Sequence, residues 1–257
     1  YLRQIQDYAT IMCIDASFPI LAREGIKPDI VFSLERVELT ARFYEDTPKK
    51  FHKDVIFAIT SIVHQRLKNA LKGDVVQYSL RPFGYTNYFH IPEYGYLGIG
   101  MSAANMAYEL IVHSKFKRCI IIGQDLAFGE DGSSHAKNAV YGENEISPKT
   151  MEDKGQKVMV EKYGGGGMVE STKVWKMFLT FYERDIANTP YPIEVINATE
   201  GGARIQGTKE IPFKEAIKLI DTTHKKKPIT LVYPSTQEYE ANLDKVRQKI
   251  EDWIELG

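Results

Sequence analysis

The sequence has 257 residues and a formal net charge of −1; 43% of its residues are hydrophobic and 26% are charged. This balance is typical of a globular protein, and the length allows one large domain or a domain with an appendage. The near-neutral charge excludes the extensive basic face of nucleic-acid-binding proteins, and no apolar stretch approaches the roughly 20 residues that span a membrane. Cys13 and Cys119 both lie inside apolar runs, so we expect buried free thiols and a cytoplasmic protein.

Short apolar runs alternate with helical patterns over the first half of the chain. The apolar runs predict buried strands, and apolar residues at helical spacing predict helices. Ser102 is a suitable N-cap for the last of these helices. Strands are expected at 9–15, 29–35, 54–60 and 75–80, and helices at 17–25, 38–46, 64–71 and 102–114.

The second half of the chain is less regular. Residues 119–128 predict a central strand of the sheet. Residues 129–157 show no period and are long for a loop, which indicates a functional or mobile segment. The four glycines of 164–167 predict either the hinge of a lid or a linker. Helices are expected at 171–187, 212–220 and 239–256, and a strand at 193–199.

The alternation of strands and helices predicts an α/β fold with a mostly parallel sheet and helices on both faces. We expect residues 1–223 to form this core and residues 224–257 to form a C-terminal helical extension. Sheets of this kind bind ligands beyond the carboxyl ends of their strands. Polar residues that directly follow the predicted strands are therefore candidate site residues.

Five predicted strands are followed directly by polar side chains. These side chains are Asp15, Glu35, Thr60 with Ser61, Asp125 and Glu200. Each of them alone is equally consistent with a cap on the following helix or turn. Together they outline one rim at the carboxyl edge of the sheet, and this arrangement favours a ligand site.

The segment 123–136 is the richest in chemically useful groups. It places Asp125 at a strand end and then Glu130, Asp131 and His135 in a loop. A carboxylate and a histidine can serve as general base and acid, and the same groups can hold a divalent metal. The alternative is a solvated acidic loop with one surface histidine. Among the six histidines, His135 is the one we expect to be functional.

Three further segments have both a functional and a structural interpretation. Residues 98–110 place glycines before a helix N-terminus, an arrangement that suits a phosphate but is also common without one. Residues 197–208 carry Gly201 and Gly202, which predict either a backbone that wraps a ligand or a tight turn with a bulge. Residues 81–100 are rich in tyrosine and predict either a wall for a sugar or base or an ordinary half-buried connection.

Four segments resemble, as a set and in order, the motility accessory factor (Maf) family. They are CIDASFPILAREGIKPDIVFSLE, GIGMSAANMAYEL, GQDLAF with the His135 loop, and NATEGGARIQGTKEIP. Archaeal 6-hydroxymethylpterin pyrophosphokinases share the same core. The resemblance covers about residues 1–220 and implies a Rossmann-like core with a sialyltransferase-like architecture.

The resemblance also implies an activity. The protein would transfer a CMP-activated nonulosonic acid, pseudaminic or legionaminic acid, to Ser or Thr hydroxyls of flagellin, as flagellar assembly and motility require. The resemblance and the strand-end rule together predict Asp125, His135 and Glu35 as catalytic candidates. They predict as donor-binding residues Asp15, Thr60, Ser61, Gly100, Ser102, Gln124, Glu200, Gly201, Gly202 and Arg204. Arg204 or Lys209 would orient the donor carboxylate. The Mg²⁺ requirement and any metal ligands stay open.

One departure from the family concerns the start of the chain. In the family a Gly-x-Gly-Pro-Ser turn between a strand and a helix precedes the segment that begins here at Tyr1. Residues 1–8 would then be the end of that helix, the sheet would lack one strand, and the fragment can be inactive even where the parent enzyme is active. Two alternatives stay open: a pterin pyrophosphokinase that uses ATP and Mg²⁺, and a non-enzymatic scaffold that binds flagellin.

Overall fold

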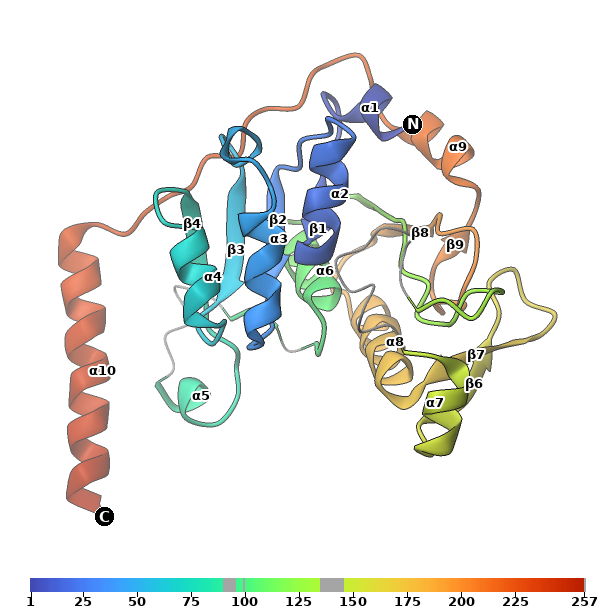
Figure 1. The fold of residues 1–257 in the computed structure, drawn as a ribbon. Coiled ribbons are helices and arrows are strands. Elements are labelled where there is room, and N and C mark those ends of the chain that lie inside the picture. The colour runs from blue at the N-terminus through green and yellow to red at the C-terminus, as the bar shows by residue number, and fades with distance from the viewer. Residues whose placement is uncertain (90–95, 99, 135–145, 257) are drawn as a thin grey trace.

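A computed structural model describes residues 1–89, 96–98, 100–134 and 146–256. Its first sheet is parallel and four-stranded, in the order β1-β2-β3-β4 (Figure 1). Met12 pairs with Ile30, Ile30 with Ile56, and Ile56 with Val75. The strands are β1 (Met12–Ile14), β2 (Ile30–Ser33), β3 (Ile56–Thr60) and β4 (Val75–Ser79). All four expected strands of this half are confirmed, each shorter than its apolar run.

Helices cover both faces of this sheet. Successive side chains in a strand point to opposite faces, so each strand contacts both layers of helices. Val31 and Phe57 lie on the face that is covered by α2 (Phe18–Arg23), α3 (Arg42–Glu45) and α4 (Gln65–Ala70). Phe32 and Ala58 lie on the other face and pack against α6 (Ala103–His113). Strands that are buried on both faces consist of nearly continuous apolar residues, and this is why they were recognisable in the sequence.

Local signals fix the ends of several helices. Gly25 adopts a φ of +65° directly after α2, a conformation that glycine adopts without a steric cost. The hydroxyl of Ser102 accepts a hydrogen bond from the backbone N–H of Asn105, which confirms Ser102 as the N-cap of α6. Two short 3-10 helices, η1 (Asp15–Ser17) and η2 (Glu38–Ala41), precede α2 and α3 directly, and a third, η3 (Lys49–Phe51), lies between α3 and β3.

The second parallel sheet consists of β5 (Arg118–Ile121), β8 (Glu194–Asn197) and β9 (Lys209–Glu210), in that order. The prediction of a central strand over 119–128 is wrong in two respects. The strand ends at Ile121, and β5 stands at an edge of its sheet. Gly123 and Leu126 have φ values of +69° and +50°. These left-handed conformations are incompatible with a continuing strand.

The glycine run of 164–167 lies between two antiparallel strands, β6 (Lys157–Glu161) and β7 (Met168–Thr172). Gly164, Gly165 and Gly166 all have positive φ, so the run forms the turn of a hairpin. This hairpin differs from the hinge or linker that the glycine run predicts. Thr172 caps the following helix, α8 (Lys173–Ala187), and a short helix, α7 (Pro148–Asp153), precedes the hairpin.

The remaining helices lie at the ends of the described chain and in one connection. They are α1 (Leu2–Ile5), α5 (Tyr85–Phe89), α9 (Phe213–Ala216) with η6 (Ile217–Leu219), and α10 (Thr236–Leu256). Residues 221–235 connect the core to α10, which stands apart from both sheets (Figure 1). The Trp253 ring stacks on that of Tyr88 at 4.4 Å. Within the described residues, every helix is too short or too polar to cross a membrane.

Candidate functional site

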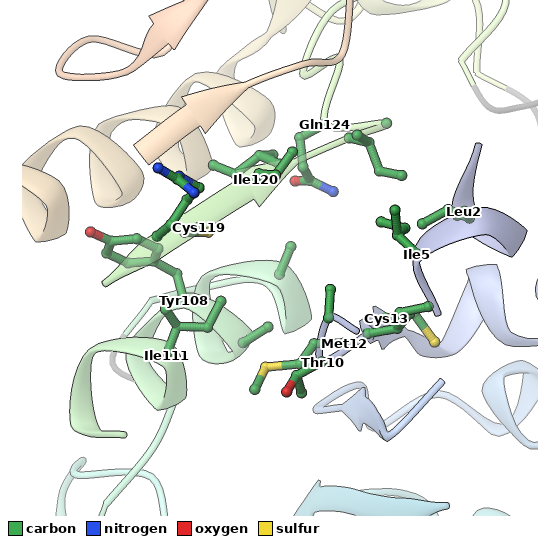
Figure 2. A pocket seen from close by; sticks show the side chains of 18 of the residues that line it. Leu2, Ile5, Thr10, Met12, Cys13, Tyr108, Ile111, Cys119, Ile120 and Gln124 are labelled. Atoms are coloured by element: carbon green, nitrogen blue, oxygen red, sulfur yellow. The ribbon is translucent and has the colours of Figure 1, made fainter. Parts of the chain in front are cut away.

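A cavity of about 640 Å³ separates the two sheets. β1 flanks it on one side and β5 on the other, so Cys13 and Cys119 lie in the two strands that border it (Figure 2). Leu2 and Ile5 of α1 face it from one direction, and α6 with Tyr108 faces it from another. The lining is mostly apolar. Ser17 and Gln124 belong to the same lining, so the polar strand ends adjoin this cavity.

Asp15 lies at the carboxyl end of β1 and is 5% exposed. One of its carboxylate oxygens accepts a hydrogen bond of 2.6 Å from the Ser33 hydroxyl, and the other accepts one of 2.8 Å from the backbone N–H of Ala16. Burial raises the pKa of Asp15 to about 6, and the nearby charge of Glu35 acts in the same direction. Asp15 therefore titrates close to neutral pH, which suits proton transfer.

Two arginines follow the strand ends of the first sheet, and the sequence analysis did not single them out. Arg36 is exposed, and Arg81 donates a hydrogen bond of 2.9 Å to the carbonyl of Gly98. Burial lowers the pKa of Arg81, while the charges of Glu109 and Glu35 raise it. Within the described residues neither arginine forms an ion pair. They form an electropositive pair beside Glu35.

The end of β3 contributes one buried polar residue, Thr60, and one half-buried polar residue, Ser61. Thr60 is fully buried, and its hydroxyl has no hydrogen-bond partner among the described residues. The backbone N–H of Ser61 donates to the carbonyl of Ser79, and the carbonyl of Ser61 accepts from the ammonium of Lys68 at 3.1 Å. Thr60 and Ser61 stay predicted donor-binding residues, and Ser61 also joins β3 to β4.

The glycines before α6 already hold an anionic group. The carboxylate of Glu109 accepts hydrogen bonds from the backbone N–H groups of Gly98, at 2.6 Å, and Gly100, at 2.7 Å. Glu109 is 9% exposed. These N–H groups are the ones that the sequence analysis reserved for a phosphate. Ser102 is likewise engaged, because its hydroxyl caps α6 and donates to the side-chain oxygen of Asn105.

Asp125 lies in the turn that follows β5, and its backbone contacts the turn that follows β8. Its carbonyl accepts a hydrogen bond of 2.7 Å from the backbone N–H of Ala203, and a Cβ on Gly202 would lie 2.3 Å from the same carbonyl. A Cβ on Gly201 would lie 4.0 Å from the carboxylate of Asp125. Burial raises the pKa of Asp125 above its ordinary value. The backbone N–H of Gln124 donates to the Thr199 hydroxyl at 3.3 Å.

Two predicted donor-binding residues, Glu200 and Arg204, already make contacts within the protein. Glu200 has a φ of +65°, and its carboxylate accepts a hydrogen bond from the backbone N–H of Phe213 at the start of α9. Arg204 forms ion pairs with Glu161 at 2.7 Å and with Glu210 at 2.9 Å. Two carboxylates therefore balance the charge of Arg204. One belongs to the hairpin and the other to the second sheet, so Arg204 links the two elements.

The acidic loop that follows Asp125 is described only in part. His135 lies outside the described residues. The Glu130 side chain is 98% exposed, and a carboxylate oxygen of Asp131 accepts a hydrogen bond from the backbone N–H of Ser133 within a turn. No group of three or more metal-ligating side chains occurs in the part of the chain that the structure describes.

The predicted rim thus consists of two groups of residues rather than one continuous line. Asp15, Glu35 and Thr60 lie at the carboxyl edge of the first sheet, and Asp125 and Glu200 lie at that of the second. The cavity lies between the two groups and is bordered at this end by Ser17 and Gln124.

Comparison with known proteins gives a family and a fold. Residues 1–131 match the family described as 6-hydroxymethylpterin diphosphokinase MptE-like. The structure of a Maf glycosyltransferase from Magnetospirillum magneticum AMB-1 is similar, with a TM-score of 0.64 and 20% sequence identity. This likeness covers 96% of the present chain and 34% of the solved one, so the chain spans about a third of that protein. No curated protein matches the sequence significantly.

The family match extends over 131 of the 257 residues, which is more than half of the chain. The fold likeness extends further, over 96% of the chain. Both findings confirm the resemblance and the Rossmann-like fold that the sequence predicted. The chain therefore belongs to the MptE-like family, and its fold is that of part of the Maf glycosyltransferase.

Proposed function

We propose that this chain is the catalytic core of a glycosyltransferase, which moves a CMP-activated nonulosonic acid to Ser or Thr hydroxyls of flagellin. One observation carries the choice of a transferase. The match to the pterin kinase family ends at residue 131, whereas the likeness to the Maf glycosyltransferase covers 96% of the chain. The donor and the acceptor follow from the sequence resemblance to the Maf family.

Two carboxylic acids are suited to the acid and base steps of such a transfer. Asp125 is exposed and lies beside Gly201 and Gly202, and its raised pKa makes it a stronger base for the proton of the acceptor hydroxyl. Asp15, with a pKa of about 6, is the candidate acid. Glu35 and His135 remain catalytic candidates from the sequence resemblance.

The departing cytidine phosphate and the donor carboxylate both require positive charge. Arg36 and Arg81 have no carboxylate partner among the described residues and are better placed for this role than Arg204, which already has two. Transition-state charge is stabilised most effectively by groups that are already in position. Arg81 is held in position by its hydrogen bond to the Gly98 carbonyl.

The second candidate function is pyrophosphate transfer from ATP to a pterin, and the family match over residues 1–131 favours it. This reaction takes Mg²⁺ with ATP, and Mg²⁺ is commonly bound through one or two carboxylates together with substrate phosphates. The charge of Glu35 acts on Asp15, and each carboxylate oxygen of Asp15 already accepts one hydrogen bond. Because the described residues contain no group of three or more metal-ligating side chains, Asp15 and Glu35 would hold Mg²⁺ only together with the phosphates of ATP.

A thermal-shift titration separates these functions. The whole protein and the present 257-residue chain are each titrated with CMP, CTP and ATP, with and without Mg²⁺. A ligand that binds the folded state raises its Tm by mass action. A shift with CMP or CTP supports the sugar transferase. A shift only with ATP and Mg²⁺ supports the pyrophosphokinase, and no shift in either protein favours a flagellin-binding scaffold.

A further inference from the structure

The hairpin of β6 and β7 lies beside α8 and contacts the short segment that leaves β5 (Figure 1). The Ser171 hydroxyl, in β7, donates a hydrogen bond of 2.7 Å to the Leu126 carbonyl. The backbone N–H of Phe128 donates one of 2.8 Å to the Glu170 carbonyl, also in β7. The Phe128 ring packs against that of Trp175 in α8, with 4.8 Å between the ring centroids. β7 and α8 therefore hold both ends of this segment.

The end of β6 contacts the turn that follows β8, on the other side of Asp125. The backbone N–H of Tyr163 donates a hydrogen bond of 2.9 Å to the Gly202 carbonyl. The next residue of that turn, Ala203, donates its backbone N–H to the Asp125 carbonyl at 2.7 Å. The hairpin therefore reaches Asp125 by two routes, one through the residues that follow it in the chain and one through the turn that binds its carbonyl.

Leu126, the residue directly after Asp125, has a strained backbone. Its φ is +50°, a conformation in which the Cβ of an L-residue lies too close to the following carbonyl oxygen. Residues in such conformations persist only where the surrounding structure imposes them. The Ser171 hydroxyl binds the carbonyl of this strained residue, and Ser171 is fully buried, so water does not compete for the bond. Ser171 therefore holds the turn in which Asp125 lies.

We propose that the hairpin positions Asp125 for catalysis and that Ser171 is the positioning residue. This rests on the proposed function, in which Asp125 takes the proton of the acceptor hydroxyl. The Asp125 side chain is exposed to an acceptor, while both contacts of the hairpin hold its backbone. A general base must lie within hydrogen-bond distance of the proton that it takes, and a displacement of about 1 Å costs roughly 100-fold in rate. Ser171 is buried, so it acts through the backbone of Leu126 and not by contact with a substrate.

A comparison of two buried hydroxyls separates this role from a merely structural one. Ser171→Ala removes the hydroxyl that donates to the Leu126 carbonyl. Thr47→Val is the matched control, because the Thr47 hydroxyl is also buried and donates at 2.7 Å to a backbone carbonyl, that of Phe43 in α3. Each variant loses one buried hydrogen bond, so we expect both to lower the Tm of the whole protein by a similar few degrees.

Steady-state kinetics of the whole protein then distinguish the two variants. We expect Ser171→Ala to lower kcat for transfer roughly 10–100-fold and to leave the donor KM within about twofold of wild type, because the displaced base acts on the acceptor in the transition state. Thr47→Val should leave both kinetic constants unchanged. If Ser171→Ala has the same kcat as Thr47→Val, the hydroxyl contributes to stability alone and the proposal is overturned.

Hydrogen exchange of the same proteins tests the positioning without a substrate. The amides of Phe128 and Ala203 report the two contacts that hold the backbone around Asp125. We expect both amides to exchange roughly fivefold or more faster in Ser171→Ala than in wild type, and at the wild-type rate in Thr47→Val. Unchanged exchange at Ala203 in Ser171→Ala overturns the proposal, because the Asp125 carbonyl then keeps its partner without the hydroxyl.

The kinetic and exchange measurements also separate this proposal from the proposed function. If the wild-type protein transfers no sugar, the proposed function is wrong, and hydrogen exchange still decides whether Ser171 holds the Asp125 backbone. If the wild-type protein transfers sugar and Ser171→Ala keeps the kcat of its control, the proposed function stands and the positioning role of Ser171 is wrong.

Discussion

The carboxylate of Asp15 accepts a hydrogen bond of 2.6 Å from the hydroxyl of Ser33, and both side chains are buried at the carboxyl ends of adjacent strands. This bond favours the ionised form of Asp15, but the loss of hydration on burial outweighs it, and the pKa of Asp15 rises to about 6. A buried carboxylate that is only partly compensated costs stability once it ionises. The same property makes it suitable for proton transfer.

The pKa of Asp15 predicts a pH dependence of stability. Its folded-state pKa lies above the unfolded value, so the folded state binds the proton more tightly. This stabilisation is complete below pH 4 and is lost as the pH rises through 6. We expect Asp15→Asn to raise the free energy of unfolding at pH 8 by roughly 1–3 kcal/mol relative to wild type, with little difference at pH 4. Urea unfolding at both pH values measures this. A variant that is equally destabilised at both contradicts it.

The close approach of Gly202 to Asp125 predicts that substitution by alanine destabilises the protein more at Gly202 than at Gly166. Gly202 and Gly166 have similar φ values of +70° and +76°. A Cβ on Gly202 would lie 2.3 Å from the Asp125 carbonyl oxygen, whereas a Cβ on Gly166 would meet nothing within 4 Å. We expect Gly166→Ala to cost about 1–2 kcal/mol through its backbone conformation alone, and Gly202→Ala to cost clearly more. If both variants lose the same free energy of unfolding in urea, the turn at Gly202 accommodates the added Cβ without strain and the prediction is wrong.

The contact of Glu109 with Gly98 and Gly100 predicts a structural role for this acid. Glu109→Ala leaves two backbone N–H groups without their acceptor, at a cost of about 1–3 kcal/mol for each group that stays buried. Glu109→Gln keeps one acceptor oxygen and should lose less. Equilibrium unfolding of both variants measures the difference. If Glu109→Ala is as stable as wild type, the carboxylate does not hold this loop in solution.

The strands of the first sheet were predictable because their environment is uniform. Val31 and Phe57 face one layer of helices and Phe32 and Ala58 the other, so the sequence is apolar throughout and reads as a strand. The division into two sheets was not predictable, because it depends on which strands pair and not on local pattern. The hairpin at 164–167 had a signal that was not used: short runs that contain valine, KVMVE and MVEST, lie on the two sides of the glycine run.

The candidate site was predictable only where side chains follow strands. The rule of polar strand ends found Asp15 and Asp125, but it was applied to acids and hydroxyls alone. Arg36 and Arg81 follow β2 and β4 in the same way, and the same rule extended to cations finds them. Glu109 lies within a helix, and no local pattern indicates that its carboxylate reaches back to the glycines before that helix.

The position of Asp125 predicts a loss of activity without a loss of fold. Asp125→Asn keeps the size of the side chain and removes its basicity, and general base catalysis contributes roughly 10²–10⁴-fold. We expect transfer by the whole protein to fall within this range while the Tm stays near that of wild type. Asp153→Asn, on the exposed end of α7, is the matched control. Full activity of Asp125→Asn would remove Asp125 from the catalytic residues.

The unpaired charge of Arg36 predicts a specific effect on donor binding. Arg36 is exposed beside Glu35 and forms no ion pair within the described residues, so Arg36→Gln should leave the Tm unchanged. Loss of a charged hydrogen bond to the donor corresponds to an increase in the donor KM of roughly 10–100-fold. Arg42→Gln, which removes an exposed arginine that pairs with Asp46 at 3.6 Å, is the control and should leave the KM unchanged. Steady-state kinetics of the whole protein with a CMP-activated donor measures both. An unchanged KM for Arg36→Gln means that the donor's negative charge is held elsewhere, with Arg81 as the next residue to test.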